Sequence, residues 1–161
     1  MPMLEGTHRA PGLQFAVVVS RYNDFVTERL LAGAREGLAT AGVTDDDVTV
    51  LRVPGAYEIP LAAQRAAETG RFAGVIALGC LIRGATPHFD YIASAVSHAL
   101  AAAAAATGVP IAFGVLTTNS AEEAIERVGP GPSNKGWEAA LAAIEMATML
   151  ATLDASERST T

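Results

Sequence analysis

The chain has 161 residues, half of them hydrophobic, and a formal net charge of −6 at pH 7. This length suits one domain with a real core, and an acidic chain without a basic run excludes nucleic-acid wrapping, because phosphate contacts require clustered Lys and Arg. One cysteine excludes an internal disulfide framework and a CxxC zinc or redox motif. The longest uninterrupted apolar run, Ala99–Ala106, is far shorter than the roughly 20 residues that span a bilayer. No signal-peptide pattern opens the chain, so we expect a cytoplasmic protein without a membrane partner.

Strands and helices are predicted to alternate after an N-terminal arm at residues 1–12, which we expect to be flexible. Leu13–Ser20 is a continuous apolar run rich in β-branched residues, typical of a central strand in a parallel sheet. Apolar residues at helical spacing predict a helix over Asp24–Ala41. The second predicted strand is Val48–Val53, which ends at a Pro-Gly pair.

The alternation continues through the middle of the chain. Ile59–Thr69 is a predicted helix, with Pro60 tolerated in its first turn. The apolar run Ala73–Leu78 predicts a third, buried strand. The alanine-rich segment Tyr91–Thr107 predicts a helix, and Pro110–Leu116 predicts the fourth strand.

The last part of the chain is predicted to be helical. Ser120, with a glutamate three residues on, forms a capping box that opens a short helix through Val128. A proline-glycine loop follows, then an amphipathic helix over Lys135–Leu153. Four strands alternating with helices predict an α/β three-layer sandwich, a flavodoxin-like four-stranded parallel sheet flanked by helices. We therefore expect one domain over residues 13–153 and a frayed tail at residues 154–161.

The predicted helix Tyr91–Thr107 is nearly apolar on every side. A surface helix normally shows a polar face, and one small domain has little to cover a second apolar side. We therefore infer a homo-oligomer with this helix at or near the subunit contact.

The segment Gly79–Asp90 carries the strongest functional signal. It follows a buried strand and precedes a helix, where a parallel sheet presents its reactive groups. Arg83 supplies a cation, Gly84 allows a ligand to approach the backbone, Thr86 supplies a hydroxyl and His88 an imidazole. These residue types predict an anion site beside a proton-transfer group, and His88 is favoured for that role because histidine titrates near working pH.

The other strand exits also carry residues suited to binding. An aromatic ring at the first exit and a carboxylate at the second could hold a flat, polar heterocycle, whose hydrogen-bonding edge backbone groups could read. These exits are Ser20–Asp24, Pro54–Glu58 and Thr117–Asn119.

Several of these residues have structural interpretations as well. Tyr22 and Tyr57 could be lids on the core, and Asn23 or Asp24 could be a helix cap. Cys80, at the end of a buried strand, favours packing over a nucleophilic role, because no basic residue lies beside it in sequence.

Arg127 and Lys135 flank the proline-glycine loop. Both could be ordinary solvated charges, and a cation suits the end of the short helix where Arg127 lies.

Six segments, in order and with family spacing, resemble lumazine synthases. The similarity runs from about Phe15 to Leu150 and is carried by Ser20–Asn23, Val53–Pro60, Gly79–Tyr91, Phe113–Thr118, Ala124–Arg127 and Asn134–Gly136. The resemblance implies condensation of 5-amino-6-(D-ribitylamino)uracil with 3,4-dihydroxy-2-butanone 4-phosphate. The product is 6,7-dimethyl-8-ribityllumazine, with phosphate and water released, in riboflavin biosynthesis. No metal or other cofactor is implied.

The resemblance also implies a role for each matching residue, with His88 as the proton-transfer residue. Residues expected to bind the ribitylaminouracil are Tyr22 (phenylalanine or tryptophan in many relatives), Ala56, Tyr57, Glu58, Cys80, Leu81, Ile82 and Phe113. Residues expected to bind the butanone phosphate are Ala85, Thr86, Arg127 and Lys135.

Relatives form homopentamers, with Phe113 and Arg127 reaching into a neighbouring subunit's site, and some assemble into icosahedral 60-mer shells. Riboflavin synthase is a further candidate partner. Two alternatives on the same fold are a non-catalytic flavin- or lumazine-binding protein and a cage-forming protein. A generic flavodoxin-like module does not explain the joint presence of Glu58, His88 and Arg127.

Overall fold

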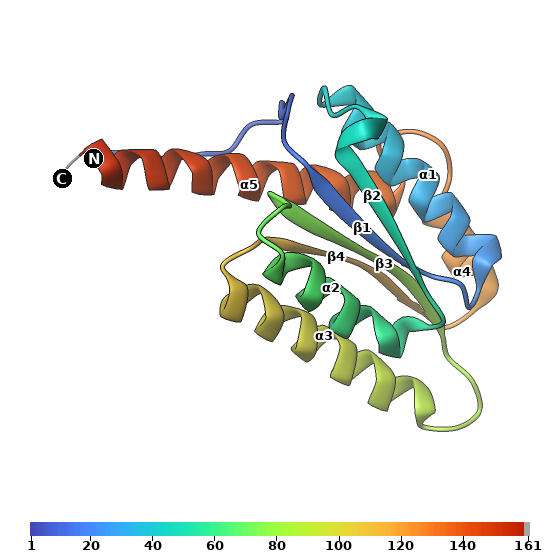
Figure 1. Ribbon diagram of the computed structural model, residues 1–161. Helices are drawn as coiled ribbons and strands as arrows, with labels where there is room; N and C mark the ends of the chain where they lie inside the picture. Colours follow the sequence, from blue (N-terminus) through green and yellow to red (C-terminus); the bar gives the residue numbers. More distant parts are fainter. Residues whose placement is uncertain (160–161) are drawn as a thin grey trace.

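The computed structural model describes residues 1–159 and places a four-stranded parallel sheet between two layers of helices (Figure 1). The strands are β1 (Phe15–Ser20), β2 (Val48–Val53), β3 (Gly74–Ile82) and β4 (Ile111–Thr118), in the spatial order β2-β1-β3-β4. The predicted parallel sheet flanked by helices is confirmed.

The position of each strand in the sheet follows from its composition. All residues of β1 are buried, and β3 is buried up to Cys80, because both strands have a neighbour on each side and helices on both faces. The edge strand β2 carries Thr49 and Arg52 among its apolar residues and is mostly half-buried. The continuous apolar runs are therefore the central strands, as predicted for β1.

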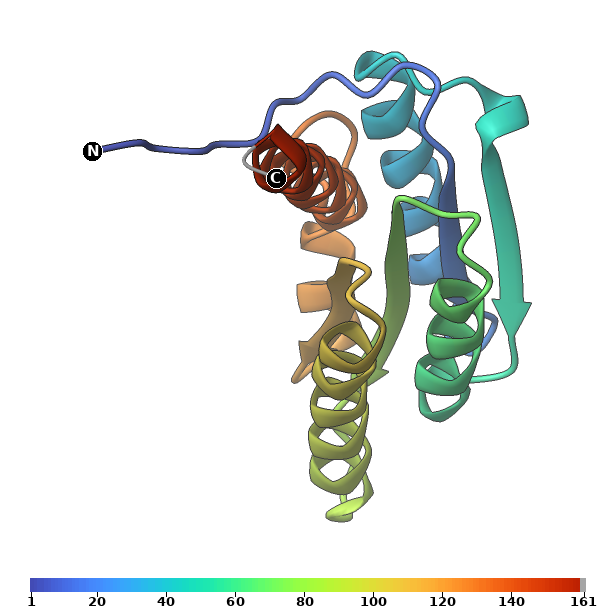
Figure 2. The same cartoon turned by 60° about the vertical axis from the view of Figure 1, so that its left-hand side comes forward.

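Helices from different parts of the chain cover the two faces of the sheet (Figure 2). One face is covered by α1 (Asp24–Thr40), α5 (Lys135–Ser159) and the short α4 (Ala121–Glu126). The other is covered by α2 (Ile59–Glu68) and α3 (His88–Thr107). Each face has its own apolar cluster, so the sheet separates two cores.

Glycines allow α1 and α5 to approach each other closely. A Cβ on Gly136 would lie 2.0 Å from the carbonyl oxygen of Leu30, and a Cβ on Gly33 would lie 2.1 Å from Oδ1 of Asn134. Both distances are far below van der Waals contact, so any larger residue at either position would push the two helices apart.

Asn134 connects the start of α5 to α1 with four hydrogen bonds, and its side chain is almost fully buried. Its Nδ2 donates to the carbonyls of Arg29 at 3.2 Å and Gly129 at 3.0 Å. Its Oδ1 accepts from the backbone N–H groups of Gly136 at 2.7 Å and Trp137 at 3.3 Å. The residue therefore caps α5 and fixes the preceding proline-glycine loop.

Several elements extend beyond their predicted ends. The third strand reaches Ile82 instead of Leu78, because parallel pairing with β4 continues as far as Ile82 opposite Thr118. Helix α3 begins at His88 instead of Tyr91.

The last helix, α5, runs to Ser159, and residues 151–159 are exposed. Helical structure therefore includes most of the segment expected to fray. Fraying of residues 154–161 stays a prediction, and residues 160–161 lie outside the described part of the chain.

Part of the N-terminal arm lies against α5. The backbone N–H of Thr7 donates to Oγ1 of Thr148 at 2.9 Å, and Ala10 donates its N–H to the carbonyl of Ala41. His8 is 3.5 Å from the carboxylate of Glu145. The segment predicted to be flexible, residues 1–12, thus makes hydrogen bonds to later parts of the chain at Thr7, Arg9 and Ala10.

By length and composition alone, α3 and α5 are apolar enough to cross a membrane. Neither helix is an uninterrupted apolar run, because polar residues occur within both, so the longest apolar run in the sequence does not reveal them. Such helices are a weak indication of a membrane span, since core helices have the same composition. Here α5 contributes Ala140, Ala143 and Ile144 to the core beside the sheet.

Much of α3 is uncovered in the single chain. Its buried side chains are Phe89, Val96, Leu100 and Ala103, while other alanines of the helix are exposed or half-buried. The prediction that a second subunit covers this helix is not tested by one chain.

Replacing Asn134 with alanine should destabilise the fold strongly. The variant loses the α5 cap and leaves two buried N–H groups and two carbonyls without their partner, which we expect to cost about 2–4 kcal/mol. Chemical denaturation followed by circular dichroism measures this loss. Thr152→Ala, which removes an exposed hydroxyl from the same helix, is the control. If Asn134→Ala lowered the free energy of unfolding no more than the control does, Asn134 would not be the residue that holds α5 and the loop in place.

Candidate active site

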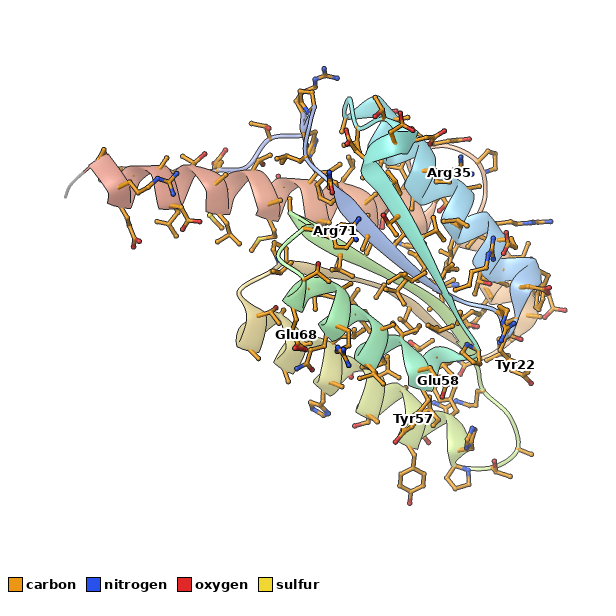
Figure 3. The ribbon with its side chains drawn as sticks, in the orientation of Figure 1. Tyr22, Arg35, Tyr57, Glu58, Glu68 and Arg71 are labelled. Atoms are coloured by element: carbon orange, nitrogen blue, oxygen red, sulfur yellow. The ribbon has the colours of Figure 1, made fainter. Side chains whose placement is uncertain are left out.

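A cavity of about 510 Å³ opens where β1, β2 and β3 end, beside the start of α3. Figure 3 places Tyr22, Tyr57 and Glu58 together at this edge of the sheet, although they come from the exits of two different strands. The cavity is lined by Tyr22, Asn23, Gly55, Ala56, Tyr57, Glu58, Leu81, Ile82, Gly84, Thr86, His88, Phe89 and Ile92.

Backbone hydrogen bonds hold the first two strand exits together. The N–H of Arg21 donates to the carbonyl of Val53 at 2.8 Å, and that of Tyr22 donates to Pro54 at 3.0 Å. Each exit therefore sets the position of the other, and the aromatic ring of Tyr22 is held near the turn that carries Glu58.

Asn23 connects the first exit to β3. Its side-chain Nδ2 donates to the carbonyl of Cys80 at 2.9 Å, and its backbone is left-handed, with φ of 64°. Asn23 does occupy the N-cap position of α1, where its carbonyl accepts from the N–H groups of Val26 and Thr27, but its side chain makes no capping hydrogen bond. Left-handed backbone at a residue other than glycine is uncommon, and here the contact with β3 accompanies it.

The tyrosines at this edge are not lids on the core. Tyr22 is 72% exposed and Tyr57 is 64% exposed, although both line the cavity. Glu58 ends a single 3₁₀ turn, Ala56–Glu58, and a Cβ on Gly55 would lie 3.3 Å from its Oε1. The carboxylate is therefore folded back over the turn, and Glu58 lines the same cavity as the two tyrosines.

The end of β3 forms one wall. Leu81 and Ile82 are half-buried and line the cavity, whereas the Cys80 side chain is buried and does not. Burial raises the pKa of the Cys80 thiol to about 11. A thiol with this pKa is neutral at working pH, so the packing interpretation of this side chain holds and a nucleophilic one does not.

The loop after β3 brings the predicted phosphate residues to the cavity. Gly84, Thr86 and His88 line it, and Ala85 is exposed between them. A Cβ on Gly84 would meet no other atom of the chain within 4 Å, so open space surrounds this backbone. The Arg83 side chain does not line the cavity. Its guanidinium contacts Asn119 and Asp90, which differs from the sequence interpretation of Arg83 as the cation of an anion site.

Three predicted site residues lie elsewhere in the chain. Phe113, on the edge strand β4, is 51% exposed and lines a smaller cavity of about 190 Å³ with Lys135. Arg127, at the end of α4, donates from a guanidinium nitrogen to the carbonyl of Glu123 at 2.8 Å, and its own carbonyl accepts from the N–H of Lys135. The structure therefore does not bring these three to the main cavity of the same chain.

The sequence did not indicate Phe89 and Ile92 as cavity residues. For Asn23 it favoured neither a ligand contact nor a helix cap. Phe89 and Ile92 lie on the first turns of α3, where apolar residues look like ordinary core positions. Within residues 1–159 no group of three His, Cys, Asp or Glu side chains is arranged to hold a metal ion.

The fold and the cavity together define an α/β protein with a cavity at the carboxyl edge of a parallel sheet, the place where such sheets bind small molecules, lined by aromatic, carboxylate and imidazole groups. The family model of 6,7-dimethyl-8-ribityllumazine synthase matches residues 12–151. A 6,7-dimethyl-8-ribityllumazine synthase from Syntrophus aciditrophicus (strain SB) is 53% identical over 146 residues, which cover 91% of this chain and 95% of that protein. The chain belongs to the 6,7-dimethyl-8-ribityllumazine synthase family. Its activity is the transferase reaction of riboflavin biosynthesis that forms 6,7-dimethyl-8-ribityllumazine.

The raised pKa of Cys80 predicts slow alkylation of the folded protein. At pH 8 a pKa of about 11 leaves about one thiol in a thousand ionised, whereas about a quarter of unfolded cysteines with pKa near 8.5 are ionised. Iodoacetamide labelling followed by intact-mass measurement should give one adduct at least about a hundredfold faster in guanidinium than in buffer. Equal rates would show that the thiol is accessible and ionised in the folded protein.

Proposed function

We propose that the main cavity is where this chain condenses 5-amino-6-(D-ribitylamino)uracil with 3,4-dihydroxy-2-butanone 4-phosphate. The observation that carries the proposal is that one cavity gathers an aromatic ring, a carboxylate, the loop after β3 and His88, from three different strand exits. Family membership supplies the reaction, and the cavity would hold both substrates.

The ribitylaminouracil would occupy the side of the cavity formed by the first two exits and the end of β3. The exposed ring of Tyr22 offers a flat surface for the pyrimidine. Glu58 would accept hydrogen bonds from ribityl hydroxyls, next to Ala56 and Tyr57 on the same turn. Backbone groups of Cys80, Leu81 and Ile82 would bind the edge of the ring.

The butanone phosphate would bind at the loop after β3. Backbone N–H groups of Ala85 and Thr86, with the Thr86 hydroxyl, are suitable donors for phosphate oxygens. His88 follows directly at the first position of α3 and lines the same cavity. An imidazole there would lie within reach of both substrates.

The reaction requires several proton transfers. The uracil amine attacks the ketone, water leaves to form an imine, and phosphate is eliminated. Attack by the ribityl-bearing nitrogen on the remaining carbonyl then closes the second ring, with loss of a second water. His88 would accept and return protons during these steps, and fixed donors would hold the charge of the departing phosphate. Holding two reactants together supplies much of the remaining acceleration.

A neighbouring subunit would complete the site. Phe113 and Arg127 lie apart from the main cavity of their own chain, and much of the apolar helix α3 is uncovered. Both observations support the homopentamer of relatives, in which Phe113 would contact the ring, Arg127 the phosphate, and Lys135 the region around it. A cytoplasmic location, assembly into an icosahedral 60-mer and contact with riboflavin synthase extend this proposal by family resemblance.

Replacing His88 with alanine should slow turnover severalfold or more without abolishing it. The imidazole's proton transfers are lost, but both substrates are still held together. Absorbance of the lumazine product, formed from both substrates, measures the rate. His8→Ala, in the N-terminal arm, is the matched control. If His88→Ala turned over as fast as the wild type, His88 would not be the proton-transfer residue. If the wild-type protein bound lumazine without forming it, the chain would be a binding protein.

Replacing Arg127 with alanine should mainly raise the KM for the butanone phosphate, because a cation that contacts its phosphate is lost. Suppose that Arg127 acts on a neighbouring subunit. Assemblies that contain both Arg127→Ala chains and His88→Ala chains should then regain activity, because about a quarter of their sites have both His88 and Arg127 intact. Steady-state kinetics at a low concentration of the butanone phosphate would detect this gain in activity.

The control for Arg127→Ala is Arg35→Ala, which removes an exposed arginine paired with Asp45. A co-assembled sample no more active than the average of its two components would place Arg127 in the site of its own chain. An unchanged KM in Arg127→Ala would remove it from the phosphate site altogether.

A further inference from the structure

Arg83 lies between β3 and the loop that carries the proposed phosphate donors. Its backbone N–H donates to the carbonyl of Thr118 at 2.8 Å, which continues the β3–β4 pairing one step beyond Ile82. The chain then leaves the sheet through residues 84–87 and enters α3 at His88. Arg83 is therefore the last residue before this loop that the sheet holds in place.

The Arg83 side chain makes three contacts, on both sides of the loop. Nε donates to Oδ1 of Asn119 at 3.1 Å, just beyond the end of β4. A terminal nitrogen lies 3.3 Å from the carboxylate of Asp90, in the first turn of α3. The guanidinium carbon lies 4.5 Å from the centre of the Phe89 ring. One side chain thus connects the end of β4 to the beginning of α3.

The loop itself has few other restraints. Within residues 1–159, Gly84, Ala85 and Thr86 make no hydrogen bond to the rest of the chain. Asn119, in contrast, is held in place, because its N–H donates to the Glu123 carboxylate at 2.8 Å. The body of α3 packs on the sheet through its own apolar residues, such as Val96 and Leu100, so the contacts of Arg83 bear on the position of the loop and of the first turn of α3.

We propose that Arg83 is a positioning residue for the reaction: by connecting Asn119 to Phe89 and Asp90, it fixes the loop amides and His88 relative to the sheet. The inference rests on the proposed function of the cavity. A planar guanidinium suits this position because its face can stack on a ring while its edge donates in two directions, whereas a lysine ammonium has no planar face. The pair with Asp90 is half-exposed and weak alone, so the three contacts act together.

The competing interpretation is that Arg83 turns into the cavity and binds the substrate phosphate directly. The two interpretations differ in which other residues matter. A positioning role requires Asn119 and Asp90, neither of which lines the cavity. Direct phosphate binding requires neither of them.

The test compares Arg83→Gln, Arg83→Lys, Asn119→Ala and Asp90→Asn in the full, assembled protein. Arg71→Gln is the matched control, because Arg71 also stacks on a phenylalanine, at 5.0 Å, but lies at the opposite end of the sheet (Figure 3). We expect Arg83→Gln to lower kcat roughly tenfold, since small displacements of catalytic groups are costly. The KM for the ribitylaminouracil should change less than about twofold, because its proposed contacts lie mainly on the strand exits.

Arg83→Lys should recover only part of the loss, and Asn119→Ala and Asp90→Asn should each reproduce part of it. Combining either with Arg83→Gln should add little, because the same connection is already broken. Hydrogen–deuterium exchange should show faster amide exchange at the start of α3, where the N–H groups of Asp90 and Tyr91 donate to the carbonyl of Pro87, in Arg83→Gln than in Arg71→Gln, with similar exchange elsewhere.

The proposal would be overturned in favour of direct phosphate binding if Arg83→Gln changed only the KM for the butanone phosphate, while Asn119→Ala and Asp90→Asn kept wild-type kinetics. Unchanged exchange and kinetics in Arg83→Gln would overturn it as well. If the wild-type protein formed no lumazine, the proposed function would fail. The exchange measurement would still decide whether Arg83 positions the loop, since it requires no activity.

Discussion

The unequal length of the pairing on the two sides of β3 is the constraint on which the site depends. Pairing with β1 ends at Leu78, whereas pairing with β4 continues to Ile82. The end of β3 therefore projects past β1 and β2, and the cavity lies at the resulting step in the sheet edge. The step also leaves the Cys80 carbonyl beyond the last β1 partner, and the side chain of Asn23 donates to it. A buried backbone oxygen is thus satisfied by a residue that at the same time shapes the cavity.

The two faces of the sheet are packed very differently. On the face of α1 and α5, Gly33 and Gly136 permit close helix contact, and the buried amide of Asn134 connects the two helices. On the other face, α3 buries only one side and leaves an alanine-rich surface exposed. The first face is complete within one chain. The second offers apolar surface to another molecule, which is the physical basis for proposing that neighbouring subunits meet there.

The proposed site is divided in a corresponding way. The groups suited to the pyrimidine, the ribityl chain and the proton transfers lie around one cavity, while Phe113, on β4, and Arg127, at the end of α4, do not line it. Sequence similarity alone treats all of these as one set of residues. The structure separates them by position, and this separation is what makes a co-assembly experiment informative.

The sequence by itself determined the order of the elements, the central placement of β1 and the family. Continuous apolar runs, helical spacing and six motifs in order are local properties, and each can be read without knowing what packs against it. Most cavity residues were also predicted, because the exits of parallel strands meet at one edge. Only the tertiary structure decided where β3 ends, that the side chain of Asn23 bonds to Cys80 instead of making a capping bond to α1, and that Arg83 contacts Asn119 and Asp90 instead of lining the cavity. These features depend on partners distant in sequence or on side-chain direction, and neither hydrophobic periodicity nor motif spacing encodes which partner a polar side chain finds.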